Sequence, residues 1–188
     1  MTGGRRTQGP PPELDPDADP EAVARAILLR QLTMGPRSRL QLEQKLRDRN
    51  VPEDLAHALL SRFEEVGLVD DAEFARMWVR SRGETRSLGR TALRRELSEK
   101  GITGETAEKA LGELSPEAEE DAARRLLARR VRPFDREDRA ARDKELRRLV
   151  AMLARKGHAP GTAFRLAAEV LAAEVLDAEA LEVPNGET

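Results

Sequence analysis

Three stretches of the sequence follow one pattern: KLRDRNVPEDLAHALL from Lys45, ELSEKGITGETAEKAL from Glu96 and MLARKGHAPGTAFRLA from Met152. Three positions align among them: a leucine (Leu46, Leu97 and Leu153), then Asn or Gly (Asn50, Gly101 and Gly157), then an alanine (Ala56, Ala107 and Ala163). An Asn or Gly just past a helix commonly adopts the left-handed conformation that ends it. Each stretch therefore predicts a helix, a short turn and a second helix, and the recurrence indicates an internal repeat.

A further helix precedes each copy, marked by an Ala-Arg pair at 24–25, 75–76 and 123–124. We therefore predict an all-α fold of three tandem three-helix repeats, helix-turn-helix-like, which complete one another's cores and form an elongated, curved body. The predicted segments are repeats at 21–67, 68–114 and 115–176, a disordered Pro/Gly-rich and acidic tail at 1–20, and a disordered acidic tail at 177–188. In the third repeat the first two helices have a longer connection, because Arg132-Pro133-Phe134-Asp135 interrupts the helical pattern.

Helix starts and buried faces support these repeats. Ser38–Gln41 has the spacing of a capping box, Asp70–Glu73 approximates one, and Ser115 precedes a proline at the first helical position. Apolar side chains recur at helical spacing around Phe74 and Trp78, and around Leu146 and Leu153. We predict that these stripes are core and that the arginines opposite them face outward.

The composition excludes several classes of protein. Of the 188 residues, 39% are hydrophobic, 36% are charged and none is cysteine, which excludes disulfides and thiolate sites. No apolar run is long enough to span a membrane, and the N-terminus lacks the apolar segment of a secretory signal. We expect a cytoplasmic protein.

Charge is strongly segregated along the chain, although the formal net charge is only −2. Residues 124–156 hold 13 basic and 5 acidic side chains, residues 76–100 hold 8 and 3, and residues 163–188 hold one and six. An anionic partner for the basic part is one interpretation. The alternative is a set of solvated helix faces with ion pairs inside each helix.

No pattern indicates catalysis. The two histidines, His57 and His158, have no partner at metal-ligand or triad spacing, so we predict structural roles for both. No phosphate-binding loop occurs, and the acidic residues cluster where helices begin. The sequence predicts no catalytic, cofactor or metal site.

Arginines dominate the basic segments, and arginine suits bidentate contacts to carboxylate or phosphate. The candidate residues for contact with a partner or DNA are Arg76, Arg80, Arg82, Arg90, Arg94, Arg95, Lys100, Arg124, Arg125, Arg129, Arg130, Arg147 and Arg148. Aromatic side chains for stacking on bases do not alternate with them, so sequence-specific reading of bases is not predicted.

The run from Gly67 to Ile102, GLVDDAEFARMWVRSRGETRSLGRTALRRELSEKGI, resembles the RecX family of recombination regulators. The resemblance rests on Leu68-x-Asp70-Asp71 with Phe74-Ala75 and Val79-Arg80-x-Arg82, on Gly89-Arg90-x-x-Leu93-x-x-Glu96-Leu97, and on Lys100-Gly101-Ile102. In the first repeat, Arg37-Ser38-Arg39, Leu42 and Lys45-Leu46 resemble the family's opening signature. The similarity spans roughly residues 22 to 176. After Lys156-Gly157, where the family often has an apolar aromatic residue, this chain has His158.

The resemblance implies a monomeric, non-catalytic regulator that lies in the groove of a RecA filament. Such a regulator contacts RecA, and DNA phosphates within the filament, and suppresses ATP hydrolysis, strand exchange and co-protease function. The alternative is a helical-repeat protein that binds the DNA backbone without RecA, which predicts binding that weakens steeply as salt rises. An enzyme would instead require a buried histidine or pair of acids, which the pattern does not predict.

Overall fold

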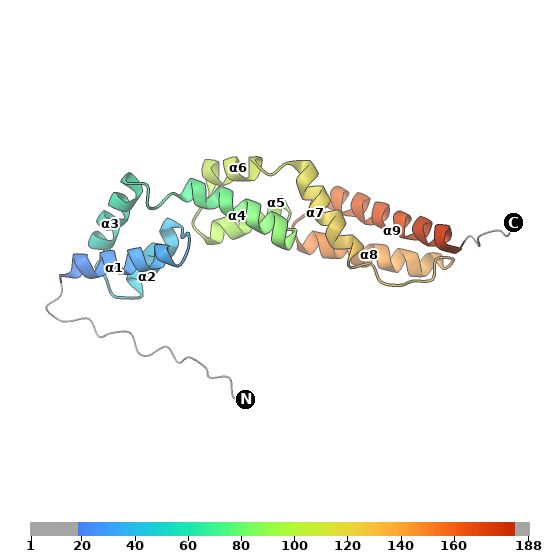
Figure 1. The fold of residues 1–188 in the computed structure, drawn as a ribbon, viewed down its shortest axis with the longest axis horizontal. Helices are drawn as coiled ribbons and strands as arrows, with labels where there is room; N and C mark the ends of the chain where they lie inside the picture. The colour runs from blue at the N-terminus through green and yellow to red at the C-terminus, as the bar shows by residue number, and fades with distance from the viewer. Residues whose placement is uncertain (1–18, 183–188) are drawn as a thin grey trace, which may run out of the picture. The chain divides into compact units, whose positions relative to one another are not determined.

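The computed structural model describes residues 19–182, and every regular element in that part of the chain is a helix. The helices are α1 (Pro20–Thr33), α2 (Arg39–Arg47), α3 (Glu53–Glu65), α4 (Asp71–Arg86), α5 (Arg90–Glu99), α6 (Gly104–Gly112), α7 (Pro116–Ala128), α8 (Arg139–Arg155) and α9 (Pro160–Glu182) (Figure 1). The predicted all-α class is confirmed.

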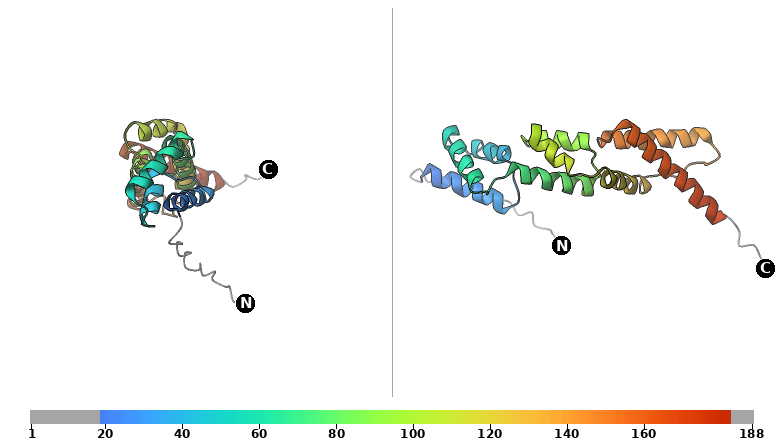
Figure 2. Two further views of the ribbon diagram at one scale, coloured as in Figure 1. Left: turned by 90° about the vertical axis from the view of Figure 1, so that its left-hand side faces the viewer. Right: turned by 90° about the horizontal axis from the view of Figure 1, so that it is seen from above.

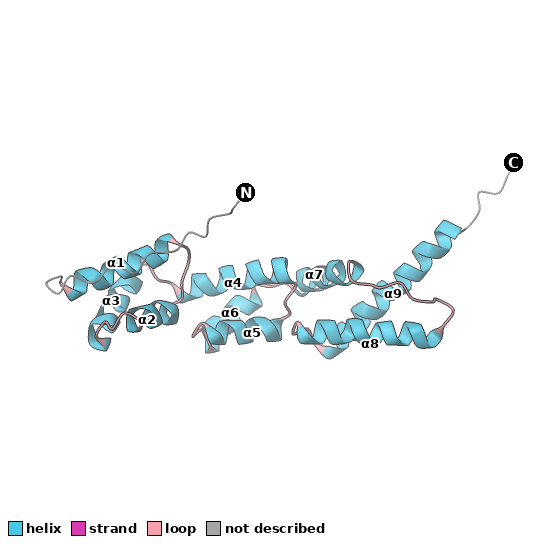
Figure 3. Ribbon diagram, turned by 90° about the horizontal axis from the view of Figure 1, so that it is seen from below, coloured by secondary structure: helices cyan, strands magenta, loops and turns pink. Residues whose placement is uncertain are grey.

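The chain divides into two compact units after Val69. In the first unit, α1, α2 and α3 pack around buried side chains that include Leu28, Leu42, Leu46 and Leu60. The second unit contains two apolar clusters, one among α4, α5 and α6 and another among α7, α8 and α9. Within this unit α7 lies end to end with α4 in space, as Figures 2 and 3 show, and α8 lies beside α9.

Each group of three helices thus has an apolar cluster of its own. This differs from the prediction that neighbouring repeats complete one another's cores. The second and third groups instead meet through backbone and polar contacts, in which the Gly89 N–H donates to the Lys156 carbonyl and the Thr91 N–H to the Gly157 carbonyl. Glycine at positions 89 and 157 allows the two backbones to approach closely there, since an added Cβ at either position would lie within 2.6 Å of the facing backbone.

The left-handed turns occur at the three predicted positions, with φ of 57° at Asn50, 80° at Gly101 and 85° at Gly157. Each turn forms a Schellman motif. The N–H after the left-handed residue donates to the carbonyl of the aligned leucine, from Val51 to Leu46, from Ile102 to Leu97 and from His158 to Leu153. All three leucines and the three aligned alanines are buried. The repeat pattern therefore encodes a helix end and the buried residues on either side of it.

The predicted helix starts are also confirmed. The Ser38 side chain accepts a hydrogen bond from the Gln41 N–H, and the Gln41 side chain accepts one from the Ser38 N–H, which completes a capping box. The Asp70 carboxylate accepts from the Ala72 and Glu73 N–H groups, and Ser115 caps α7 ahead of a proline. These caps satisfy donors that a helix leaves unpaired at its first turn.

Two predictions about the chain ends have different outcomes. The predicted N-terminal tail lies outside the described residues, apart from its last two positions. At the other end α9 runs to Glu182, so the prediction of disorder from Asp177 is wrong for residues 177–182. The reason is that this acidic segment, DAEALE, consists mainly of good helix formers and extends an existing helix. Residues 183–188 lie outside the described part.

No helix within the described residues is both long and apolar enough to cross a membrane.

Candidate partner-binding surface

Several of the candidate arginines form ion pairs with carboxylates of the same chain. Arg94 on α5 donates two hydrogen bonds, of 2.7 and 2.9 Å, to the Glu108 carboxylate on α6. The hydrogen bond from Arg94 lowers the pKa of Glu108, and the same contact raises the pKa of Arg94. Arg76 pairs in a similar way with Glu73, its hydrogen-bonded neighbour at 2.6 Å, and this contact raises the pKa of Arg76. These guanidinium groups already have a carboxylate partner.

Trp78 is half-buried and packs against the apolar cluster of the second repeat, as predicted, and its indole N–H also belongs to a polar cluster. Its indole N–H donates to the Glu96 carboxylate at 2.8 Å. The Arg82 guanidinium lies 4.3 Å from the ring centroid and 3.6 Å from Glu96, and the Lys100 ammonium lies 5.3 Å from the ring. Cation–π contacts therefore hold two candidate cations against the protein's own surface.

Two arginines of the third repeat are also paired. Arg124 contacts three carboxylates, those of Glu120, Asp121 and Glu169, at 3.0 to 3.3 Å. Arg148 donates to the buried Glu145 at 2.7 Å and to the Arg130 carbonyl.

The prediction that Arg148 simply faces outward is therefore wrong, because this side chain turns back to compensate a buried acid. The hydrogen bond from Arg148 lowers the pKa of Glu145 despite its burial, and the Arg132 N–H contributes to the same shift. No pattern in the sequence marked Glu145 as buried, since it sits in a run of charged residues.

The remaining candidates are exposed and have no carboxylate partner among the described residues: Arg80, Arg95, Arg125, Arg129, Arg130 and Arg147. They lie on α4, α5 and α8 and at the end of α7. The structure thus divides the candidate set into cations that contact an acidic or aromatic side chain of the same chain and cations that contact none. A cation of the second group has no such contact to give up when a partner binds.

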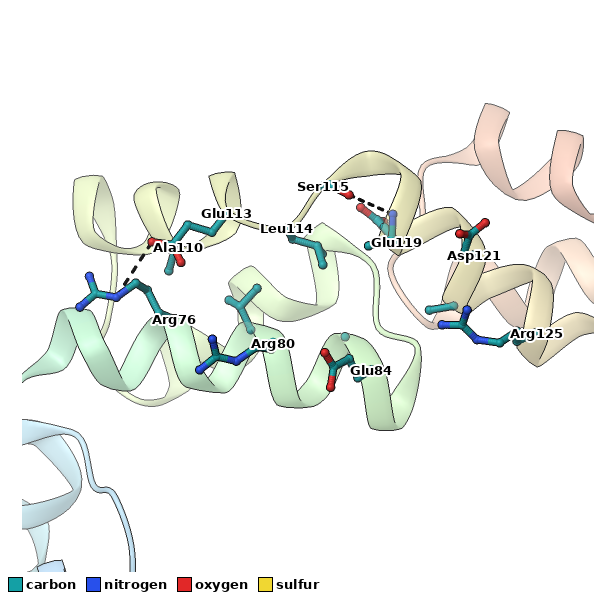
Figure 4. Close-up of a pocket in the computed structure, with 14 residues that line it drawn as sticks. Arg76, Arg80, Glu84, Ala110, Glu113, Leu114, Ser115, Glu119, Asp121 and Arg125 are labelled. Carbon is teal, nitrogen blue, oxygen red and sulfur yellow. Dashed lines mark hydrogen bonds and ion pairs between the residues drawn. The ribbon is translucent and has the colours of Figure 1, made fainter.

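A groove of about 450 Å³ runs between α4 and the segment from α6 into α7, and Figure 4 shows Arg80 and Arg125 at its edges. The apolar part of its lining includes Val79, Gly83 and Leu114. The Glu84 carboxylate also faces the groove, so the lining carries both signs of charge. No histidine lines this groove, and its lining combines apolar, acidic and basic side chains.

Sequence reasoning missed the polar junction between the second and third repeats. His158 is buried, with its Nε2 3.0 Å from the Ser87 carbonyl oxygen and its Nδ1 3.2 Å from the Glu119 carboxylate. The predicted structural role of His158 agrees with this position. Arg90, a candidate for partner contact, instead donates to the Leu114 carbonyl at 2.6 Å and lies 3.6 Å from Glu119. Burial raises the pKa of Glu119, but His158 and Arg90 lower it by more, so the net shift is downward.

His57 occupies a different environment from His158. It is exposed on α3, and its Nδ1 lies 3.1 Å from the Arg39 guanidinium. Within residues 19–182 no group of three or more potential ligands is arranged to hold a metal ion.

A second feature that the sequence analysis missed lies beside the junction of the second and third repeats. Lys156 follows α8 directly, and its ammonium group donates to the Arg86 carbonyl at the end of α4. Burial lowers the pKa of Lys156, and the nearby charges of Arg130 and Arg86 lower it further. Only Arg130 of these three belonged to the candidate set, because the sequence does not reveal that the ends of three helices meet.

Comparison with protein families identifies two matching models. Residues 24–63 match the first three-helix domain of RecX, and residues 70–111 match its second three-helix domain. The chain is 47% identical over 169 residues to the regulatory protein RecX of Streptomyces coelicolor, covering 90% of this chain and 88% of that protein. It is 45% identical over 163 residues to the regulatory protein RecX of Thermobifida fusca, covering 87% and 86%.

Solved structures show the same architecture. A crystal structure of regulatory protein RecX aligns with a TM-score of 0.68 at 25% identity, covering 82% of this chain and 79% of that one. The crystal structure of RecX from Lactobacillus salivarius aligns with a TM-score of 0.69 at 23% identity, covering 80% and 96%. The second similarity concerns the fold alone.

Proposed function

Because this chain belongs to the RecX family of regulatory proteins, we propose that it binds the filament of a RecA-type recombinase and modulates its activity. In this proposal the chain lies in the filament groove and inhibits ATP hydrolysis, strand exchange and co-protease function. It acts in the cytoplasm, as a monomer, through binding alone and without a catalytic step or cofactor.

The observation that supports a binding role most directly is the set of exposed arginines without an internal partner. A surface cation that already pairs with a carboxylate gains little from a new anionic partner, whereas an unpaired cation keeps its full field. We therefore assign the partner contact to Arg80, Arg95, Arg125, Arg129, Arg130 and Arg147 rather than to the whole candidate set.

The test is a titration of RecA's DNA-dependent ATPase rate with this protein. A filament regulator is expected to change the rate at sub-stoichiometric amounts. An ATPase rate that stays flat in excess protein would overturn the proposal.

Matched variants then test the assignment of residues. Arg95→Glu with Arg147→Glu reverses two unpaired charges, and we expect it to weaken inhibition about ten-fold or more. The control, Arg94→Ala with Glu108→Ala, removes an ion pair between α5 and α6 without changing the net charge and is expected to inhibit within about two-fold of wild type. Equal inhibition by both variants would show that the unpaired arginines are merely solvated.

A second candidate function, binding to the DNA backbone without RecA, is favoured by the same unpaired arginines. It predicts that the protein binds duplex or single-stranded DNA alone, with a logarithmic affinity that falls linearly with the logarithm of the salt concentration. DNA binding of this kind together with a flat ATPase titration would select this function over the first.

A further inference from the structure

The groove between α4 and the segment from α6 into α7 is formed by two repeats. Its lining comes from α4 and the end of α6 in the second repeat and from α7 in the third. Its volume of about 450 Å³ is large enough for a few side chains of a partner. The apolar residues of the lining are Val79, Gly83, Ala110, Leu114, Ala118 and Ala122.

Gly83 leaves space in the wall of this groove. It lies within α4, where glycine is less favourable than alanine. Within the described part, a Cβ added at Gly83 would meet only the Leu114 Cδ1 atom, at the ordinary van der Waals distance of 3.5 Å. The packing of the chain itself therefore has room for alanine. The absence of a side chain at this position instead widens the groove.

The charges around the groove are unevenly compensated. The lining acids Glu113, Glu119 and Asp121 each have a cationic partner in the same chain, at 4.0, 3.6 and 3.0 Å. Arg80 and Arg125, at the edges of the groove in Figure 4, are exposed and have no carboxylate partner among the described residues. An occupant that places a carboxylate opposite either arginine therefore breaks no ion pair of the protein.

The same lining favours a protein segment over a nucleic acid. None of the lining residues is aromatic, so no base can stack there. Glu84 lies one helical turn after Arg80, and it is the one acid of the lining without a cationic partner in the described part. A nucleic-acid strand carries a charge on every nucleotide and would meet this carboxylate. A peptide can place single carboxylates opposite the two arginines and keep the positions between them apolar.

We propose that this groove is the docking site for an acidic segment of the recombinase, which inserts an apolar side chain between Arg80 and Arg125. The inference rests on the proposed function and assigns to the groove a contact with the protein of the filament rather than with its DNA. Burial of the inserted side chain supplies affinity, and the two arginines fix the orientation of the segment through charge-assisted hydrogen bonds.

The experiment measures binding of the full chain to two immobilised targets: a recombinase filament on single-stranded DNA with a non-hydrolysable ATP analogue, and the same DNA alone. Ala118→Leu places a larger side chain in the groove at an exposed position of α7, and we expect it to weaken filament binding about ten-fold or more. Ala128→Leu is the matched control at an exposed position of α7 outside the lining, and it is expected to bind within about two-fold of wild type. Neither change is expected to alter affinity for the DNA alone.

Charge variants test whether the occupant is acidic. Arg125→Gln removes a cation at the edge of the groove, and we expect it to weaken filament binding about three- to ten-fold. Glu84→Gln removes the uncompensated acid with little change of shape, and it is expected to strengthen filament binding by up to about three-fold. Stronger binding by Arg125→Gln, or weaker binding by Glu84→Gln, would contradict an acidic occupant.

Thermal melting shows whether the variants are folded. Ala118→Leu is expected to melt at or above the wild-type temperature, because leucine covers apolar surface of the groove. If it melts well below wild type, Gly83→Ala becomes the deciding variant, since alanine suits a helix and fits beside Leu114. We expect Gly83→Ala to melt at a higher temperature than wild type and to bind the filament about three-fold more weakly.

The outcomes separate this inference from the proposed function. A wild-type protein that binds the filament no more tightly than the DNA alone would overturn the proposed function, and the docking site with it. If wild type binds the filament, and Ala118→Leu and Gly83→Ala bind it as tightly as Ala128→Leu, the docking site alone is overturned. Equal losses on the filament and on the DNA would identify a nucleic acid as the occupant, and a wild-type dimer that Ala118→Leu dissociates would identify a second copy of the chain. Either result would overturn the proposal.

Discussion

The first and second repeats differ in how they stabilise the starts of their middle helices, α2 and α5. In the first repeat Ser38 is fully buried and caps α2 with its own side chain, in a reciprocal pair with Gln41. In the second repeat the corresponding residue is Gly89, which has no side chain to cap α5. The Gly89 N–H instead donates to the Lys156 carbonyl of the third repeat, and the Thr91 N–H donates to the Gly157 carbonyl.

The comparison shows that the start of a helix can be stabilised by a capping side chain of its own repeat or by contact with the next repeat. Ser38 satisfies helix donors from within three residues of sequence, so the start of α2 is complete within its own unit. A serine side chain at Gly89 would occupy the space of the Gly157 carbonyl group. Glycine at this position therefore permits the third repeat to dock, and the helix start depends on that docking.

The largest effect is expected from Gly157→Ala. Gly157 has φ of +85°, and an added Cβ would lie 2.3 Å from the Ala92 backbone nitrogen. Left-handed strain of about 1–2 kcal/mol and overpacking of about 1–3 kcal/mol together predict a loss near 3 kcal/mol. Urea unfolding followed by fluorescence of Trp78, the single tryptophan, measures this loss in the second unit.

Gly104→Ala is the control for that variant. Gly104 also has positive φ, at +58°, but no atom lies within 4 Å of an added Cβ. We expect it to cost about 1 kcal/mol, from backbone strain alone. Equal losses in the two variants would mean that the junction tolerates a side chain and that the close approach does not stabilise the unit.

The helix ends were predictable from the sequence, whereas the junction was not. Asn50, Gly101 and Gly157 could be assigned as left-handed because helix ends depend on nearby residues and recur at the same place in each repeat. The contact between Gly89 and Gly157 joins two segments far apart in the chain. A glycine in the sequence does not indicate which distant residue will pack against it. The basic residues could likewise be listed from the sequence, but paired side chains could not be told from unpaired ones, since Arg94 and Arg95 differ only in whether Glu108 is within reach.

A smaller effect is expected when His158→Leu places an apolar side chain at the junction. The aligned positions hold apolar Val51 and Ile102, so the backbone turn accepts leucine. The substitution leaves the buried Ser87 carbonyl and Glu119 without the imidazole, and we expect a loss of about 2 kcal/mol in urea unfolding. His57→Leu, at the exposed histidine, is the control and should change stability by less than about 0.5 kcal/mol. A neutral His158→Leu variant would show that apolar packing alone suffices at this place.

The stability of the junction is also expected to fall in acid, through Glu119. The pKa of Glu119 is lower in the folded protein than its ordinary value, because contacts from His158 and Arg90 outweigh burial. Its stabilising contribution is therefore complete above the pKa of the unfolded chain and disappears as the pH falls through the folded pKa. We expect Glu119→Gln to cost about 1–1.5 kcal/mol at pH 7 and progressively less in acid, in urea unfolding at a series of pH values. A constant loss at every pH would contradict a role for the carboxylate charge.

The smallest effect is expected from Ser38→Ala, which removes the local cap of the first repeat. Loss of a serine cap costs about 1 kcal/mol, and the Gln41 side chain can still accept from the backbone at position 38. Hydrogen exchange of amides in the first turn of α2 should quicken, while exchange across α5 and the unfolding midpoint reported by Trp78 should remain at wild-type values. The effect should be confined to the first repeat in this way if the Ser38 cap acts only within its own repeat. A shift of the Trp78 transition as large as that of α2 would show instead that the first repeat, like the second, depends on contacts outside itself.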